Sequence, residues 1–457
     1  MRIHGIRSGR VAVVFALLAL VSTLGGGATV VAQEAGEPVV VCELAYYTGA
    51  FQSYGPSLTN DVRFPIDEVI NLDPPLGRPW ELVSEDIGDS FEGQAAKTCI
   101  EQHGAEILVS IAHQYRTYRE YMMEVWAEND SPLGPSVHGG AIPGNLGGKP
   151  GEPIFRAQGI DQGLGVFGAQ YADMIGAENV VIFNTDVTGF QLAADAEEKA
   201  AGLLGINVLD HIVSQSGQSS YRTEAQRIAD LKPDAVLIQA GSTESATLIR
   251  EAAEAGLSLN WVGETGWGEA EFIGSLGTDP IPTQKSIGFA TIAPDTSTPA
   301  WEFFQPLWDA QPACSETGGV PPSCRPYDAT VVYPFSTYDV LVQTALAIEE
   351  AGSTKASEWA PAMHEVGEAP GEVCYTYADC LALIREGKDI DYEGITGSGS
   401  YTDGGVNAVT PAYVPFNADG SRGEPVPIDP EQAFSLLDQV KTEAVCDPAD
   451  PPNECTY

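Results

Sequence analysis

The hydrophobic and polar positions of the chain alternate between two periods. A short β-branched apolar run at residues 39–46 is typical of a strand that is covered on both faces. A loop containing glycine follows. From about residue 56 to residue 71 the apolar positions then recur at helical spacing, with Leu58, Val62 and Ile66 on one stripe. This order of strand, loop and helix predicts the first unit of a parallel α/β sheet.

Further units of this kind follow, and they fall into two sets. The first set has predicted strands at 80–86, 107–111 and 135–138 and predicted helices at 91–103 and 118–129, with later helices at 301–308 and 338–351. The second set has predicted helices at 163–175, 188–204, 221–231 and 243–255 and predicted strands at 180–183, 207–213, 235–238, 260–263 and 412–416. The pattern therefore predicts an α/β fold with two Rossmann-like lobes, each built on a parallel sheet.

The length of 457 residues also favours two lobes, because it exceeds the usual length of a domain with a single hydrophobic core. Residues 145–153 are rich in glycine and proline, which is the composition of a connector. We expect chain crossings near 154–156, 287–290 and 397–404, which together make a three-strand hinge. The predicted division is residues 33–153 and 286–398 for the N-terminal lobe, and residues 154–285 and 399–457, including a disulfide-clipped tail, for the C-terminal lobe.

Residues 1–32 predict a secretory signal peptide. Three arginines precede an apolar run at 11–24 that is too short to span a bilayer, and small residues at 30–32 suit cleavage. An uncleaved anchor is the alternative. We therefore expect an exported chain that is soluble once the signal peptide is removed.

Eight cysteines in an exported chain predict disulfides. Close spacing favours three local pairs, which are Cys314 with Cys324, Cys374 with Cys380, and Cys446 with Cys455. Cys42 and Cys99 remain, and they pair by elimination. Metal ligation is the alternative, but no C-x-x-C spacing occurs and the six histidines are scattered.

The chain is strongly acidic, with 64 acidic residues, 22 basic residues and a formal charge of −42. This balance argues against nucleic acid and anionic membranes as partners, because phosphate binding needs clustered Lys and Arg. A solvated acidic surface is the plain interpretation. A preference for cationic ligands is the alternative.

Three stretches carry motifs in an order that one known family shares. They are T-G-x-x-x-x-Y-G at 48–55 with D-E-V-I-N at 67–71, Y-D-V-L at 338–341 with A-I-E-E-A-G at 347–352 and I-R-E-G at 384–387, and Y-E-G-I-T-G at 392–397 with S-Y-T-D-G-G at 400–405. Together they resemble the amino-acid- and amide-binding branch of the type I periplasmic solute-binding proteins. That family supplies the extracytoplasmic receptors of ABC importers, so the resemblance implies a ligand cleft between two lobes.

In parallel α/β sheets, ligands lie at the carboxyl ends of strands, beside the N-termini of helices. Sequence position therefore nominates the ligand-binding residues Tyr54, Gln114, Tyr115, Arg116, Thr117, Gly139 and Gly140 in the first lobe and Thr188, Thr243, Glu264 and Thr265 in the second.

The resemblance supports part of this set. Family members hold the carboxylate or carbonyl end of the ligand at the turns that correspond to 115–117 and 139–141. Here Tyr115 and Arg116 stand where small hydroxyl residues are common, which argues against a plain aliphatic amino acid. A solvent-facing Arg116 is the alternative. The acidic residue that binds a ligand ammonium in the family corresponds to Glu264 or, in an ungapped alignment, to the position of Thr265.

Residues 163–168 fit G-x-G-x-x-G, and Asp186 follows at about the distance of a dinucleotide-binding fingerprint. The fingerprint requires a strand that runs directly into the first glycine, whereas these glycines fall within a predicted helix. We therefore expect no nucleotide cofactor. No nucleophile motif occurs, because Gly397-Ser398-Gly399-Ser400 misses the G-x-S-x-G spacing.

The combined interpretation is a receptor rather than an enzyme. We expect an extracytoplasmic, periplasmic or secreted protein, monomeric and without cofactor. It binds a small polar metabolite by cleft closure and delivers it to an ABC permease in the inner membrane. A ligand-sensing subunit of the same fold for a signalling partner is one alternative, and an exported hydrolase is another.

Overall fold

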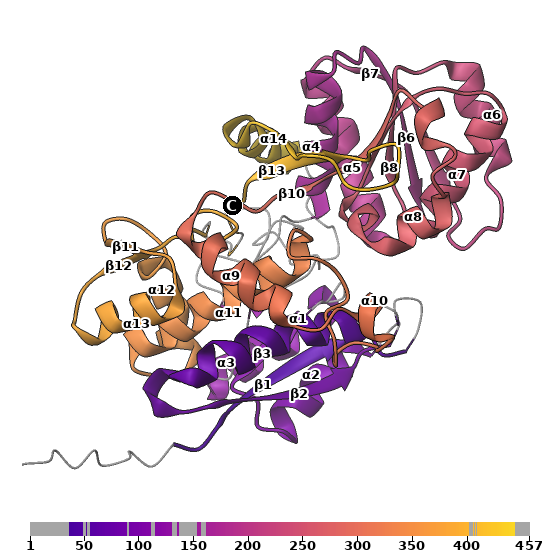
Figure 1. Ribbon diagram of the computed structural model, residues 1–457. Helices are drawn as coiled ribbons and strands as arrows, with labels where there is room; N and C mark the ends of the chain where they lie inside the picture. The colour runs from indigo at the N-terminus through magenta and orange to yellow at the C-terminus, as the bar shows by residue number, and fades with distance from the viewer. Residues whose placement is uncertain are drawn as a thin grey trace, which may run out of the picture. The chain divides into compact units, whose positions relative to one another are not determined.

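The computed structural model describes residues 36–48, 52, 55–88, 91–110, 115–129, 135–136, 153–156, 161–401, 405, 407 and 409–443. Two main sheets, each flanked by helices, dominate this part of the chain (Figure 1). Within it, no helix combines the length and apolar content needed to cross a bilayer. The predicted signal peptide and the pair Cys446/Cys455 lie outside the described residues.

The first sheet has five parallel strands in the order β2-β1-β3-β4-β5. Its strands are β1 (Val39–Ala45), β2 (Trp80–Asp86), β3 (Ile107–Ser110), β4 (Pro135–Ser136) and β5 (Phe155–Arg156). The helices between them are α1 (Gly55–Glu68), α2 (Glu92–Glu101) and α3 (Tyr115–Asn129). The β1 sequence VVVCELA is almost wholly buried, as expected for a central strand with neighbours on both sides.

The second sheet has seven strands in the order β14-β13-β10-β9-β8-β6-β7. Its strands are β6 (Asn179–Thr185), β7 (Asn207–Ser214), β8 (Ala235–Gln239), β9 (Asn260–Gly263), β10 (Ser286–Ile292), β13 (Pro411–Pro415) and β14 (Val426–Pro427). Its helices are α4 (Asp161–Met174), α5 (Thr188–Leu203), α6 (Arg222–Leu231), α7 (Ser242–Glu254), α8 (Ala270–Leu276) and α14 (Pro430–Glu443). Strands β6 to β10 pair in parallel, whereas β13 pairs antiparallel with both β10 and β14.

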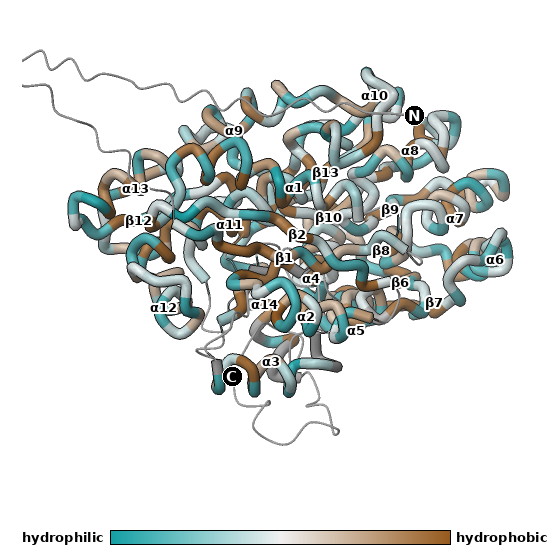
Figure 2. Tube along the Cα trace, turned by 90° about the horizontal axis from the view of Figure 1, so that it is seen from below, coloured by the Kyte–Doolittle hydropathy of each residue, from teal (hydrophilic) through white to brown (hydrophobic). Residues whose placement is uncertain are grey.

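The remaining elements follow β10 and pack on the side of the first sheet. They are α9 (Pro299–Ala310), α10 (Cys314–Thr317), α11 (Val332–Ala351), α12 (Ala356–Glu365), α13 (Tyr377–Arg385) and the short parallel pair β11 (Glu372–Cys374) and β12 (Ile390–Tyr392). Every residue of α11 from Val332 to Ile348 is buried, and its tube carries long hydrophobic stretches in Figure 2. A helix that is apolar all round belongs inside a core, and α11 packs between α1 and α12.

Three chain segments pass between the two sheet regions, and backbone hydrogen bonds join them. The N–H of Arg156 donates to the carbonyl of Gly405 at 2.7 Å, and the N–H of Asn407 donates to the carbonyl of Arg156 at 3.2 Å. The N–H of Ala293 donates to the carbonyl of Thr410 at 3.2 Å. These contacts make the hinge that the sequence predicts. The exact lobe boundaries at 153, 285 and 398 stay predictions.

The described disulfides agree with the predicted pairing. Cys314 bonds to Cys324 and Cys374 bonds to Cys380, and each bond closes a local loop. The pair obtained by elimination, Cys42–Cys99, ties strand β1 to helix α2.

The G-x-G-x-x-G segment lies inside α4, as predicted, and its glycines allow α4 to pack closely against α5. A Cβ added at Gly165 would lie 2.1 Å from the carbonyl oxygen of Ala193, and one added at Gly168 would lie 2.2 Å from an oxygen of Glu197. Both contacts are far closer than van der Waals distance, so only glycine lets α4 approach α5 this closely. The motif is explained by contact between two helices.

Candidate functional site

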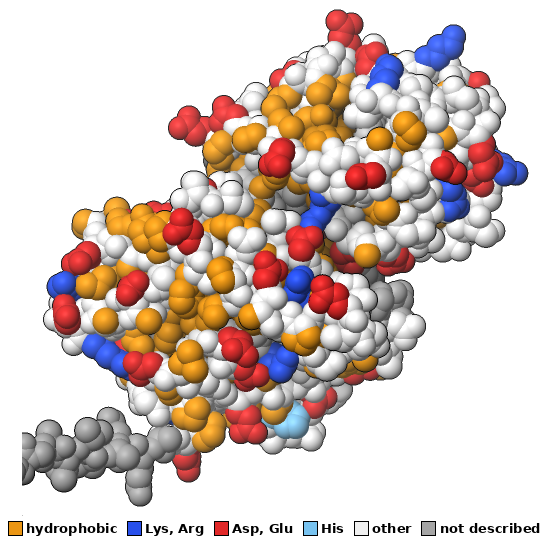
Figure 3. Space-filling view, in the orientation of Figure 1, with side chains coloured by type: hydrophobic (Ala, Val, Ile, Leu, Met, Phe, Trp, Pro, Cys, Tyr) orange, Lys and Arg blue, Asp and Glu red, His pale blue; other side chains and the backbone are white. Residues whose placement is uncertain are grey.

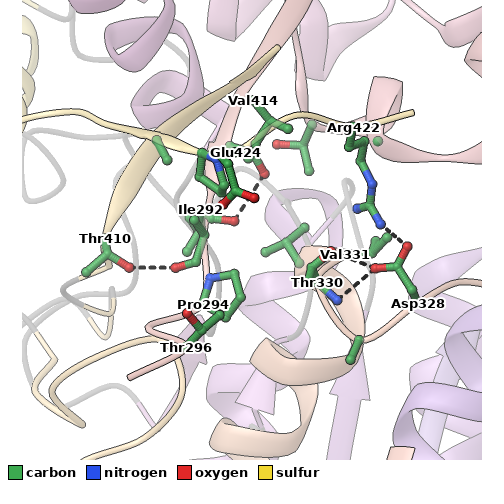
Figure 4. A pocket seen from close by; sticks show the side chains of 18 of the residues that line it. Ile292, Pro294, Thr296, Asp328, Thr330, Val331, Thr410, Val414, Arg422 and Glu424 are labelled. Atoms are coloured by element: carbon green, nitrogen blue, oxygen red, sulfur yellow. Dashed lines mark hydrogen bonds and ion pairs between the residues drawn. The ribbon is translucent and has the colours of Figure 1, made fainter. Parts of the chain in front are cut away.

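A cavity of about 860 Å³ lies where elements of both sheet regions meet. Its walls come from strands β10 and β13, the hairpin that leads into β14, the turn after β9, helix α9 and the start of α11. Figure 4 shows Ile292, Thr410 and Val414 on the strand side and Asp328 and Thr330 beside α11. The cavity is therefore bounded by residues from both lobes, as a closing cleft requires.

An ion pair crosses this cavity. The guanidinium of Arg422, from the β13–β14 hairpin, donates to Asp328, which precedes α11 (Figure 4). Thr330 adds a backbone donor at 3.0 Å and a hydroxyl donor at 2.6 Å to the same carboxylate. Burial opposes ionisation of Asp328, but Arg422 and these donors outweigh it and hold its pKa below the ordinary value.

Glu264 lies at the carboxyl end of β9 and caps the 3₁₀ turn Thr265–Gly268. Its carboxylate accepts the N–H of Gly266 at 2.7 Å. Burial, reinforced by the charge of Asp161, raises the pKa of Glu264 to about 7. Thr265 is buried beside it, lines the cavity, and donates its hydroxyl to the carbonyl of Ala290 at 3.4 Å.

Three further carboxyls, on β1, on α1 and after the turn that follows β9, have raised pKa values. Burial, together with Glu264 and Glu271, raises the pKa of Glu269 to about 8. Burial raises the pKa of Glu43, on β1, to about 7. Asp61, on α1, is fully buried, and its pKa stands well above the ordinary value. Within the described part of the chain, one carboxyl oxygen of each of Glu43, Asp61 and Glu269 has no hydrogen-bond partner.

The structure places the residues predicted from sequence unevenly. Glu264 and Thr265 lie together at the end of β9, and Thr265 borders the cavity. Thr243 is exposed at the start of α7, where its hydroxyl donates to Glu271 at 2.9 Å.

Other predicted residues are placed only by their backbone or not at all. Thr188 begins α5, and Tyr115, Arg116 and Thr117 begin α3, directly after β3. The residues Tyr54, Gln114, Gly139 and Gly140 lie outside the described part of the chain. The ligand-binding role of all these residues stays a prediction.

Comparison with known proteins identifies the family. The model of the periplasmic binding protein family matches residues 38–315, which is more than half of the chain. The chain belongs to the periplasmic binding protein family. No curated protein matches its sequence.

Solved periplasmic binding proteins share this fold at low sequence identity. A leucine-binding protein, LivK, from Thermotoga maritima has a TM-score of 0.64 and 17% identity, with 86% of this chain and 99% of that chain covered. LivJ from Streptococcus pneumoniae, in complex with isoleucine, has a TM-score of 0.64 and 14% identity over 86% and 99%. A solute-binding protein from R. palustris, in complex with benzoate, has a TM-score of 0.62 and 14% identity over 86% and 95%.

Sequence reasoning missed Asp61 and Glu269. Asp61 lies three residues after Leu58 and four before Pro65, so it falls on the apolar stripe of α1, and a carboxyl on such a stripe is a signal that could have found it. Glu269 follows the 3₁₀ turn after Glu264, and we find no pattern in the sequence that marks it.

Proposed function

We propose that this periplasmic binding protein is the extracytoplasmic receptor of an ABC importer and captures an amino acid, an amide or a related small polar solute. The observation that carries the proposal is the cavity bounded by both lobes, with Glu264 and Thr265 at the carboxyl end of β9. The family match and the fold shared with receptors of amino acids and aromatic acids support it.

In this mechanism no covalent bond is made or broken. The three hydrogen-bonded crossing segments let one lobe rotate against the other, so the cleft closes on the solute and excludes water. In the closed cleft each polar contact gains strength because the local dielectric falls. The closed form then presents both lobe surfaces to a permease. Export through the predicted signal peptide and action as a monomer belong to this proposal.

A thermal-shift screen tests the function. The mature chain is melted with L-amino acids, their amides, urea and benzoate, each at a fixed excess. A true ligand at 100 times its Kd adds about 2.7 kcal/mol to the free energy of unfolding, and the melting temperature rises accordingly. The ligand should be recovered unchanged after long incubation. A chain that melts identically with every compound, or that converts one of them, contradicts the proposal.

A further inference from the structure

Two sequence motifs that lie outside the cavity meet at the base of the hinge. Y-D-V-L at 338–341 belongs to the buried helix α11, and Y-E-G-I-T-G at 392–397 begins at the end of β12 and leads into the third crossing segment. Neither motif lines the cavity assigned to the solute. Their contact therefore needs an explanation of its own.

The carboxylate of Asp339 joins the two motifs. Its Oδ2 accepts the N–H of Thr396 at 2.7 Å and the hydroxyl of Thr396 at 2.9 Å, and its Oδ1 accepts the hydroxyl of Tyr392 at 3.0 Å. Burial raises the pKa of Asp339 to about 6, and the donors of Thr396 and Tyr392 limit that rise. Above this pKa the carboxylate is charged, and charge-assisted hydrogen bonds are stronger than neutral ones.

The loop after β12 approaches α11 very closely. A Cβ added at Gly394 would lie 2.6 Å from Cγ of Asp339, which is far closer than van der Waals distance. One helical turn after Asp339, the side-chain amide of Gln343 donates to the carbonyl of Gly399 at 2.7 Å. Asp339 and Gln343 share a face of the helix, because side chains one turn apart lie above one another. Helix α11 therefore holds the third crossing at two points.

From this loop, hydrogen bonds reach the other two crossings. The hydroxyl of Thr396 accepts the side-chain amide of Asn407 at 3.2 Å, and the backbone N–H of Asn407 donates to the carbonyl of Arg156, in the first crossing, at 3.2 Å. The N–H of Asp295, which follows β10 in the second crossing, donates to the carbonyl of Ile395 at 3.1 Å. All three crossings are thus connected to the segment that α11 holds.

Helix α11 is suited to be the fixed end of a hinge. It is buried from Val332 to Ile348 and packs between α1 and α12, so it cannot shift without disturbing a close-packed core. Hinge motion is absorbed by a few residues between rigid parts. Beyond Thr396 lie Gly397 and Gly405, with φ values of 106° and 75°, and glycine tolerates such backbone angles.

We propose that Asp339 is the anchor of the interlobe hinge: through Thr396 and Asn407 it fastens the three crossings to α11 and restricts the range of positions that the lobes adopt. Asp339 does not line the cavity, so it acts by positioning. The inference rests on the proposed function, because the range of lobe positions matters to a receptor that closes on its solute. A hinge with fewer accessible positions loses less conformational entropy on closure.

Hydrogen exchange of the mature chain without solute, followed by mass spectrometry, tests the anchor. Asp339→Asn removes the charge and replaces one acceptor oxygen by a donor. Exchange should become at least about 10-fold faster in peptides that contain Arg156, Ala293 and Asn407, one for each crossing, because a lost hydrogen bond to a buried charge favours local opening by roughly that factor. Peptides from β1 and β6, in the cores of the two lobes, should keep their rates.

Distances between the lobes give a readout that a purely local role would not change. Spin labels at Gln94→Cys, on α2, and at Ala255→Cys, directly after α7, occupy exposed positions in the two lobes. Pulsed electron–electron resonance on the solute-free protein should give a broader distribution of label separations when Asp339→Asn is added. A side chain that only stabilised its own lobe would lower the melting temperature and leave this distribution unchanged.

Thr396→Val is a milder variant. Its backbone N–H still donates to Asp339, but the hydroxyl that links Asp339 to Asn407 is lost. Exchange around Asn407 and Arg156 should therefore become faster. This variant also decides the question if Asp339→Asn does not fold. Thr396→Ser keeps the hydroxyl and should behave like the unaltered protein.

Glu197→Gln is the matched control. Glu197 is also a fully buried carboxyl, but it lies on α5 and accepts the side-chain amide of Gln239 at 3.2 Å, within the second lobe. This substitution should leave both the exchange of the three crossings and the label separations unchanged.

Two results would overturn the inference. Faster exchange confined to residues 392–397, with unchanged label separations, shows that Asp339 serves only its own loop. Equally faster exchange in β1 and β6 shows a general loss of stability. No solute enters either measurement, so both results leave the receptor function intact, whereas a failed thermal-shift screen contradicts that function and leaves the hinge measurements unaffected.

Discussion

Two groups of carboxylates beside the same cavity differ in whether the protein supplies their partner. Asp328 has Arg422 and two donors from Thr330, and its pKa stays below the ordinary value. Among the described residues, no basic side chain pairs with Glu264 or Glu269, and burial raises their pKa values to about 7 and about 8. The first carboxylate is paired with a cation of the chain, whereas burial favours the protonated form of the other two.

This difference distinguishes a carboxylate that stabilises the fold from carboxylates that are candidates for ligand recognition. Surface charge alone would not make this distinction, because acidic side chains outnumber basic ones in the chain as a whole, and Figure 3 shows both kinds spread over the visible face. Pairing within the protein identifies Asp328 as a structural link between hairpin and helix. Lack of pairing identifies Glu264 and Glu269 as candidates for ligand contact.

The largest expected effect is on affinity at the unpaired site. Glu264→Gln should weaken binding of an amino-acid ligand by about 2–4 kcal/mol, roughly 30-fold or more, because the ligand ammonium loses a buried carboxylate. Titration calorimetry measures it. Asp328→Asn is the control from the paired site and should change affinity less than about 3-fold. Comparable losses in the two variants would remove the distinction between the sites.

The second effect is on stability as a function of pH. A carboxyl whose folded pKa is raised holds its proton longer in the folded state, so its favourable contribution is complete below the unfolded pKa and is lost as pH rises through the folded value. For Glu269 that window runs from about 4.5 to about 8. The free protein should therefore melt at a lower temperature at the upper end of this window than at the lower end.

Glu269→Gln should flatten this dependence, by an amount on the order of 2 kcal/mol across the window. Thermal melts followed by circular dichroism measure it. Glu43 and Glu264 add slopes of the same sign and remain in the variant. A protein whose melting temperature rises over this window would contradict the assignment of raised pKa values.

The smallest effect concerns the paired site. Arg422→Ala should cost about 1 kcal/mol of stability, because the ion pair is partly exposed. The pair stabilises the fold above the ordinary pKa of Asp328, and this contribution is lost as pH falls through the lowered value. A double-mutant cycle with Asp328→Asn, repeated at high salt, measures the coupling. Zero coupling at low salt would show that the two side chains do not interact in solution.

The sequence predicts most of the parallel-sheet core because periodicity is strong there. The run at 39–46 and the later apolar runs became β1, β2, β3, β6, β8 and β9 nearly at the expected residues. Helices α12 and α13 were not predicted, since their short apolar stripes are interrupted by charged and small residues. Helix α14 was missed although Ala433, Leu436, Leu437 and Val440 have helical spacing, because the surrounding proline and aspartate content dominated the interpretation.

The candidate site was predictable only where chemistry coincides with a strand end. Glu264 follows β9, so its position at the site could be inferred from topology. The contact between Asp61 and Tyr327 could not be inferred in this way, since the two residues are 266 positions apart in the sequence. Their contact depends on α1 packing beside the segment that precedes α11. Only tertiary structure brings such residues together.

The second sheet is completed by residues translated long after its other strands. Strand β13 pairs with β10, and Gln170 of α4 donates to the carbonyl of Asp429 at 3.0 Å and to Gln432 at 2.8 Å. A nascent polypeptide emerging from the ribosome therefore exposes the flank of β10 and one face of α4 until these last segments are synthesised. Truncation before residue 411 would therefore yield a chain with an open sheet edge prone to aggregation.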